Sequence, residues 1–177
     1  MEVTIRPANP GDVEAMVAIL PRLAEFELPP NRKAEDLWTG DADTLRAWAA
    51  GDETLADVLR VLAADAEGHG VVGVALVRLQ PEFMSRAPSA HLEAIAIAPV
   101  ADGHGISKRL LAEAEATSRA AGALSMTLHV FANNERARSV YDRAGWNGEL
   151  LRYVKPLGSD ATAESTIEST SDTGDAS

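Results

Sequence analysis

The chain has 177 residues and a formal net charge of −11 at pH 7, from 27 acidic and 16 basic side chains. This length suits one domain with a sizeable core, and the excess of acid argues against a nucleic-acid partner, whose recognition needs a basic face. The absence of cysteine excludes disulfides, thiolate catalysis and thiol-ligated zinc. No apolar run approaches the roughly 18 residues of a membrane span, and the first residues lack a signal-peptide pattern, so we expect a cytoplasmic protein without a membrane partner.

The N-terminal part of the chain is dominated by helical patterns. Residues 3–7 alternate as a short strand, and the apolar spacing of residues 9–27 predicts a helix. Pro21 lies inside that helical pattern, so we expect a kink or two abutting pieces. Residues 34–49 predict a second helix, broken near Gly40.

The remainder is richer in strand patterns. Two apolar, β-branched runs within residues 56–80 flank the turn "DAEGHG", which predicts an antiparallel hairpin. The order of elements favours a mixed α/β (α+β) fold around a largely antiparallel sheet. The later segments predict, in order, a strand at 89–99, a helix at 106–121, a strand at 123–131, a helix at 134–144 and a strand at 149–155.

Residues 157–177 differ in composition from the rest of the chain, with five acidic residues and no basic or aromatic one. Such a segment cannot bury enough apolar surface to fold, so we expect a disordered acidic tail after a domain at residues 1–156. Removing the tail from the count leaves −11 − (−5) = −6 for the domain.

A glycine-rich turn, "ADGHGIS" (residues 101–107), joins the strand at 89–99 to the helix at 106–121. It lacks the Lys and Ser or Thr pair that follows the second glycine of a P-loop, and it lacks the third glycine of a Rossmann fingerprint. Two interpretations remain. The turn is purely structural, or it opens a helix whose N-terminal N–H groups bind a pyrophosphate.

A second motif, "NNERARSVYDRAGW" (residues 133–146), places Tyr141 seven residues after Asn134 and on the same helical face. By itself it fits an amphipathic helix with a buried tyrosine equally well. Together with the glycine turn, it resembles the GCN5-related N-acetyltransferase (GNAT) superfamily, over roughly residues 3–155. The resemblance implies the GNAT fold, a mixed and largely antiparallel sheet of six to seven strands flanked by about four helices.

The resemblance also implies a cleft for acetyl-CoA as co-substrate. The strand before the turn would pair with the pantetheine arm, Asn134 would contact this arm or orient its helix, and Tyr141 would protonate the departing thiolate. We expect no metal, because the histidines lack metal-ligand spacing. The cofactor contacts implied for the strand, the turn and the helix start fall on Ile95, Ala96, Ile97, Gly103, His104, Gly105, Ile106 and Ser107.

Asp102 departs from the family pattern, which has Arg or Gln at this position. A carboxylate about 5 Å from a phosphate repels it by roughly 3 kcal/mol at an effective dielectric near 20, although molar salt would screen most of this repulsion. Alternatively the side chain of Asp102 caps the helix that follows, and this is the interpretation that we favour.

An amine with a pKa of about 10.4 is almost wholly protonated at pH 7, so its attack on a thioester needs a base. Glu93 is the candidate, since it lies on the strand expected to pair with the cofactor. A glutamate at this position recurs in the diamine (spermidine/spermine-type) branch of the family, which the chain loosely resembles. The alternative for Glu93 is an ion pair with an arginine or a solvated position. His91 could share the proton or be structural.

The sequence therefore predicts an acyltransferase that moves an acetyl group from acetyl-CoA to a primary amine of a small molecule or peptide by direct attack. The alternative is a non-catalytic acyl-CoA-binding or regulatory module on the same fold, for which Asp102 is the main evidence. A purely structural partner protein is a third interpretation. Relatives in the diamine branch are commonly dimers, so a homodimer is one expectation for the assembly.

Overall fold

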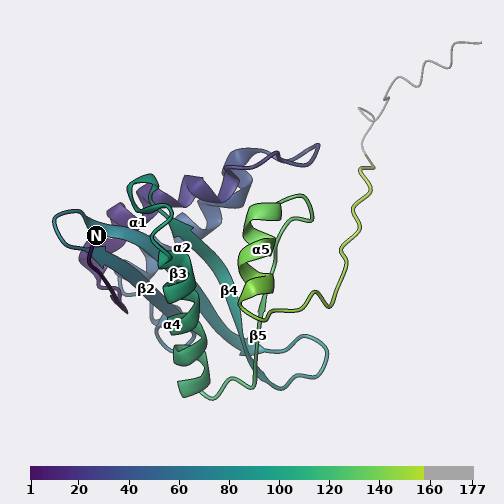
Figure 1. The fold of residues 1–177 in the computed structure, drawn as a ribbon. Helices are drawn as coiled ribbons and strands as arrows, with labels where there is room; N and C mark the ends of the chain where they lie inside the picture. Colours follow the sequence, from purple (N-terminus) through teal and green to yellow (C-terminus); the bar gives the residue numbers. More distant parts are fainter. Residues whose placement is uncertain (158–177) are drawn as a thin grey trace, which may run out of the picture. The chain divides into compact units, whose positions relative to one another are not determined.

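A five-stranded sheet, with its strands in chain order, forms the centre of the computed structural model, which describes residues 1–157 (Figure 1). Neighbouring strands are antiparallel except the last two, which are parallel. The strands are β1 (Val3–Pro7), β2 (Leu59–Ala66), β3 (Gly70–Pro81), β4 (Pro88–Ile97) and β5 (Ser125–Leu128). Met1–Trp146 form one compact unit, and residues 147–157 are not part of it.

Helices cover both faces of this sheet. On β2, Leu62 and Ala64 pack on the α4 side, whereas Val61 and Ala63 pack on the side of α1 and α2. Because both faces are buried, β2 and β3 are apolar nearly throughout instead of alternating with polar residues. The α-helices of the described residues are α1 (Val13–Ile19), α2 (Thr39–Ala49), α3 (Glu53–Ala56), α4 (Ile106–Ala120) and α5 (Glu135–Arg143).

The N-terminal helical region breaks where proline requires it, and the predicted break at Pro21 is confirmed. α1 ends at Ile19 and a 3₁₀ helix, η2 (Leu20–Ala24), continues the chain. Pro21 has no N–H to donate, so an α-helix cannot pass through it without losing a hydrogen bond.

The helical region at 34–49 is interrupted near Gly40, as expected, but the interruption is not at Gly40 itself. A 3₁₀ helix, η3 (Ala34–Leu37), precedes Trp38, and Gly40 lies in the first turn of α2. Backbone N–H groups in a first turn have no intrahelical partner, so glycine weakens the helix less there than in its middle. The interruption falls on Trp38, whose φ of −140° is not helical.

The mixed α/β class and the largely antiparallel sheet are confirmed. The sheet has five strands among the described residues, instead of the expected six to seven, and the same residues form five α-helices instead of about four. Residues 149–155, predicted as a strand, have no regular structure. Their apolar side chains stay exposed, 82% for Leu151 and 88% for Tyr153, and a strand without a covered face is not stable. β5 is also shorter than the predicted 123–131.

The acidic tail expected at 157–177 lies, apart from residue 157, outside the described residues. Within residues 1–157, no helix is both long and apolar enough to span a membrane.

α4 approaches β3 closely at Gly73. A Cβ added to Gly73 would lie 3.0 Å from Cδ1 of Ile97, 3.1 Å from Cβ of Ala64 and 3.1 Å from Cδ1 of Leu110. Only a residue without a side chain fits between the helix and the sheet at this distance. Gly73 therefore sets the spacing between α4 and β3, the strand that pairs with β4.

Gly73→Val should lower the free energy of unfolding by about 2–3 kcal/mol, because it overpacks a rigid interface. Urea denaturation measures the change. Gly40→Ala is the matched control, since an added Cβ there meets nothing within 4 Å, and it should leave stability equal or slightly higher. Equal stability of Gly73→Val and wild type would show that α4 can shift outward at little cost.

Candidate active site

The pairing of β3 with β4 slips at one residue, Glu93. Leu76 lies opposite Ala94 and Val77 lies opposite Leu92, which leaves Glu93 as an extra, bulged residue. The bulge reverses the direction in which the following side chains of β4 point. Leu92 packs on the α4 side of the sheet, whereas Ala94 packs on the side of α1 and α2. Side chains two residues apart would otherwise share a face.

β4 and β5 separate at the same place. Their parallel pairing ends with Leu92 opposite Leu128. Beyond this pair, residues 93–97 of β4 and residues 129–131 line one cleft. Within the described residues, no strand pairs with this edge of β4 beyond Leu92, so its outward backbone groups are free to bind a ligand.

The glycine turn forms another wall of this cleft. Gly103 and Gly105 have φ values of 77° and 69°, a left-handed conformation that side chains disfavour. Gly105 is the N-cap of α4 and supplies no side-chain cap. The first N–H groups of α4 therefore lack a side-chain acceptor beside Ile106 and Ser107, which line the cleft.

α5 contributes Asn134 and Tyr141. Oδ1 of Asn134 accepts a hydrogen bond from the backbone N–H of Ala137 at 3.1 Å and so caps the helix. The ring of Tyr141 lies 6.0 Å from that of Trp146, between centroids. Burial raises the pKa of Tyr141 above its usual value, so its hydroxyl stays protonated at neutral pH.

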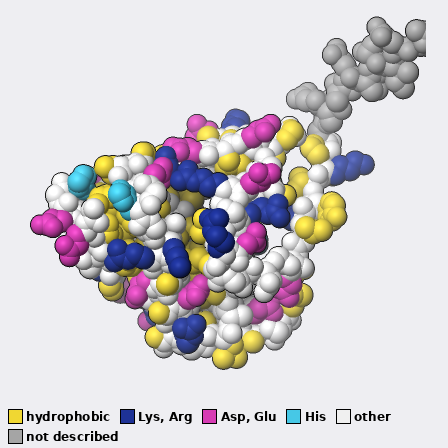
Figure 2. All heavy atoms as spheres, viewed as in Figure 1, with side chains coloured by type: hydrophobic (Ala, Val, Ile, Leu, Met, Phe, Trp, Pro, Cys, Tyr) yellow, Lys and Arg dark blue, Asp and Glu magenta, His cyan; other side chains and the backbone are white. Residues whose placement is uncertain are grey.

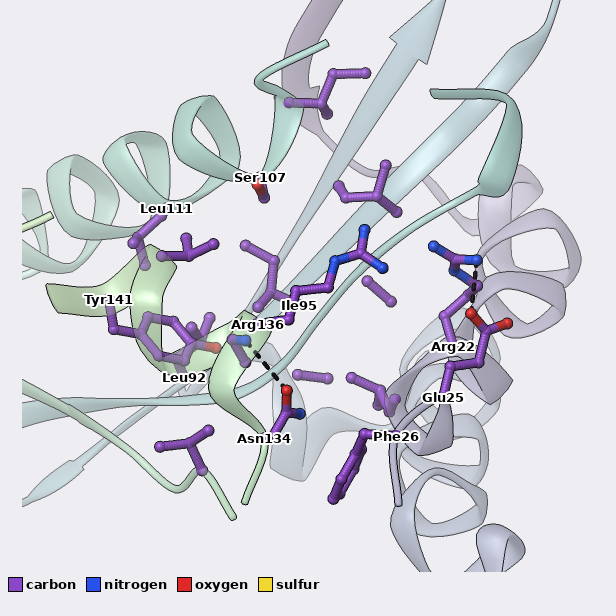
Figure 3. A pocket seen from close by; sticks show the side chains of 18 of the residues that line it. Arg22, Glu25, Phe26, Leu92, Ile95, Ser107, Leu111, Asn134, Arg136 and Tyr141 are labelled. Carbon is purple, nitrogen blue, oxygen red and sulfur yellow. Dashed lines mark hydrogen bonds and ion pairs between the residues drawn. The ribbon is translucent and has the colours of Figure 1, made fainter. Parts of the chain in front are cut away.

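The structure brings all but one of the predicted site residues to this cleft (Figure 3). The exception is His104, whose exposed side chain does not line it. The residues brought together are Glu93, Ile95, Ala96, Ile97, Gly103, Gly105, Ile106, Ser107, Asn134 and Tyr141.

Asp102 does not cap α4, so that expectation is wrong. Its Oδ2 accepts a hydrogen bond from Nη2 of Arg22 at 2.7 Å, and its Oδ1 accepts one from Nη2 of Arg136 at 3.1 Å. Asp102 lies three residues before the N-cap Gly105, too early for a capping side chain. Both arginines line the cleft, and the sequence patterns did not indicate either one.

Glu93 forms a bidentate ion pair with Arg78. Nε of Arg78 donates to Oε1 of Glu93, and Nη2 donates to Oε2 at 3.2 Å. The ion pair left open by the sequence is therefore present. Asp41 on α2 lies near this pair, and its pKa is raised to about 6, mainly by burial and further by the charge of Glu93, against the lowering effect of Arg78.

His91 is held within the sheet. Its Nδ1 lies 2.8 Å from Oγ1 of Thr127 on β5, and its ring centroid is 4.7 Å from that of His129. Burial, with help from His129, lowers the pKa of His91, so its ring is neutral at pH 7. His129, not His91, lines the cleft. No group of three His, Asp or Glu side chains within residues 1–157 is arranged to hold a metal.

Comparison with known proteins agrees with this architecture. The model of the acetyltransferase (GNAT) family matches residues 20–146, which include β4, the glycine turn and α5. The chain belongs to the GNAT acetyltransferase family. The predicted resemblance to GNAT is thereby confirmed, whereas the resemblance to the diamine branch stays a prediction. No curated protein matches the chain by sequence.

Solved GNAT structures share the fold at low sequence identity. The aminoglycoside N-acetyltransferase AAC(6')-Iy in complex with CoA is 20% identical, with a TM-score of 0.66 over 89% of this chain and 96% of that one. A ribosomal-protein-alanine N-acetyltransferase from Brucella melitensis is 17% identical, with a TM-score of 0.63 over 88% and 100%. Glucosamine-6-phosphate N-acetyltransferase from Arabidopsis thaliana is 12% identical, with a TM-score of 0.64 over 89% and 100%.

Asp41→Asn should stabilise the protein at pH 7.5 but not at pH 3.5. The folded-state pKa of about 6 exceeds the ordinary 3.8, so stability falls as pH rises between these values. The penalty above pH 6 is at most about 3 kcal/mol, which the variant would relieve. Urea denaturation at both pH values measures it, with the exposed Asp43→Asn of the same helix as control. An equal gain at both pH values would rule out ionisation of Asp41 as the cause.

Proposed function

We propose that the protein is an acetyl-CoA-dependent N-acetyltransferase that acetylates a primary amine of a small molecule or peptide by direct attack on the thioester. One observation carries this proposal. Where β4 and β5 separate, a free strand edge, an uncapped helix N-terminus and a buried tyrosine line a single cleft.

The cleft fits the parts of CoA in order. The edge of β4 at residues 95–97 presents backbone N–H and C=O groups in an extended row, which suits the amides of a pantetheine arm. The turn at residues 103–107 and the first turn of α4 present N–H groups and a helix dipole to the pyrophosphate. His104 would contribute through its backbone alone. AAC(6')-Iy, a relative of the same fold, is in complex with CoA.

In the reaction, the amine nitrogen attacks the thioester carbon, the carbon–sulfur bond breaks, and the leaving thiolate takes a proton. Tyr141 is the proton donor in this proposal, because it lines the cleft and its raised pKa keeps the phenol protonated. Asn134 fixes the start of the helix that carries Tyr141.

Glu93 is the proposed acceptor of the proton that the amine loses. Each oxygen of Glu93 accepts one hydrogen bond from Arg78, and a carboxylate oxygen has a second lone pair for an ammonium or a water. Its position at the bulge places it where the cleft opens between β4 and residues 129–131.

The acceptor would bind beside Glu93 against Phe26, Leu37 and Phe131, which line the same cleft. This lining combines apolar surface with a carboxylate, which suits an amine on a carbon skeleton. The named relatives act on an aminoglycoside, glucosamine-6-phosphate and a ribosomal-protein alanine, all of them amines. We place the acceptor of this protein in the class of cationic small amines or peptide amines.

The alternative of a non-catalytic CoA-binding module loses its main support. It depended on Asp102 repelling phosphate, and Asp102 forms ion pairs with Arg22 and Arg136. The cleft also holds an oriented tyrosine, which simple binding does not need.

The direct test is release of free thiol from acetyl-CoA in the presence of amines. Polyamines, amino acids, aminoglycosides and a peptide with a free N-terminus form a suitable panel. At least one of them should accelerate thiol release well above the rate with water alone. Binding of CoA by calorimetry with no turnover on any amine of the panel would favour the binding module.

Tyr141→Phe should lower kcat by about 100-fold with any active amine, because general acid catalysis typically contributes at least this much. The affinity for CoA should stay unchanged. Tyr153→Phe is the matched control, since Tyr153 is 88% exposed, and it should keep full activity. Unchanged kcat in Tyr141→Phe would show that another group protonates the thiolate.

A further inference from the structure

Three charged side chains from distant parts of the chain meet at the cleft. Arg22 comes from η2, Asp102 from the glycine turn and Arg136 from the first turn of α5. Figure 3 shows Arg22 on one side of the cleft and Arg136 on the other. All three residues line the cleft, and the carboxylate of Asp102 joins the two guanidinium groups.

The two arginines differ in how firmly they are held. The side chain of Arg22 is 16% exposed, and it also pairs with Glu25 at 2.6 Å. The side chain of Arg136 is 71% exposed, and Asp102 is its ion-pair partner at 3.1 Å. A guanidinium has five N–H donors, so both arginines keep donors that these carboxylates do not use.

The elements that carry the two arginines are also tied together near the cleft. The rings of Phe26 and Phe131 lie 5.3 Å apart between centroids. Nδ2 of Asn133 donates to the backbone carbonyl of Glu27. These contacts tie the residues after η2 to those before α5 and so hold together the two segments that carry Arg22 and Arg136.

We propose that Arg22 and Arg136 bind the phosphate groups of CoA and that Asp102 positions both guanidinium groups beside the glycine turn. This inference rests on the proposed function. The turn itself offers backbone N–H groups without a full positive charge, whereas a guanidinium binds phosphate through two charge-assisted hydrogen bonds. Figure 2 shows basic side chains gathered between α4 and α5, with acidic ones among them.

Asp102 acts here as a positioning residue. Without a partner, an exposed arginine such as Arg136 would have to lose side-chain freedom when it bound phosphate. The carboxylate of Asp102 orders the guanidinium groups before the ligand arrives, and this reduces the entropy lost on binding. Its repulsion of phosphate acts in the opposite direction, so the sign of its net effect is measurable.

Calorimetry with two probes tests the arginines. CoA carries the phosphates, and pantetheine carries the same arm without them. Arg22→Gln and Arg136→Gln should each weaken CoA binding about tenfold and leave pantetheine binding unchanged. Arg143→Gln is the matched control, because Arg143 is exposed on the same helix as Arg136 and does not line the cleft. CoA affinities equal to that control would overturn the role of the arginines.

Asp102→Asn tests the positioning. The substitution makes the cleft more positive, so simple electrostatics predicts tighter CoA binding. We expect the reverse, a CoA affinity several-fold weaker, with the exposed Asp142→Asn of α5 as the control of equal charge. In the Arg22→Gln, Arg136→Gln background, Asp102→Asn should no longer weaken binding. Tighter binding in Asp102→Asn alone would overturn the positioning role.

Failure of this inference and failure of the proposed function would give different binding results. Wild-type protein that binds CoA while the arginine variants bind it equally well overturns this inference and leaves the proposed function standing. Wild-type protein that binds neither CoA nor pantetheine overturns the proposed function itself. Unchanged pantetheine affinity in each variant shows that the fold and the strand edge are intact.

Discussion

The bulge at Glu93 is the constraint on which the cleft depends, because it coincides with the end of the pairing between β4 and β5. Up to Leu92 the two strands form an ordinary parallel ladder, and beyond it the edge of β4 has no partner within residues 1–157. A free edge is normally a liability that invites aggregation. Here the edge lies in a cleft between the glycine turn and α5, so a ligand rather than another chain can use it.

The rigidity of this bulge comes from the core on both sides of the sheet. Val74, Ala75, Leu76 and Val77 of β3 are all fully buried, and they alternate between the two core clusters. A close-packed strand on one side of β4 prevents the bulge from sliding along the chain, because a slip of one residue would turn apolar side chains to the wrong face. The position of Glu93 is therefore fixed by packing some distance from the cleft itself.

Local patterns predicted the elements, and long-range contacts decided the site. The hairpin in residues 56–80, the break at Pro21 and the helix at 106–121 follow from alternation, proline and apolar spacing, each of which acts over a few residues. The bulge at Glu93 depends on its register with β3.

The partners of Asp102 are 80 and 34 residues away along the chain, so local pattern favoured a helix cap instead. The strand predicted at residues 149–155 failed for a related reason, since it has no strand partner in the described sheet.

The carboxylates near the bulge give a physical reason for a cationic acceptor. Asp41, Glu93 and Arg78 together would carry one net negative charge if all three were ionised. The pKa of Asp41 is raised mainly by its burial and further by the charge of Glu93, against the lowering effect of Arg78. An ammonium bound beside Glu93 would add the missing positive charge and favour the ionised form of Asp41. A neutral acceptor would give no such relief. The charge arrangement therefore supports the proposal of an acceptor amine that binds in its protonated form.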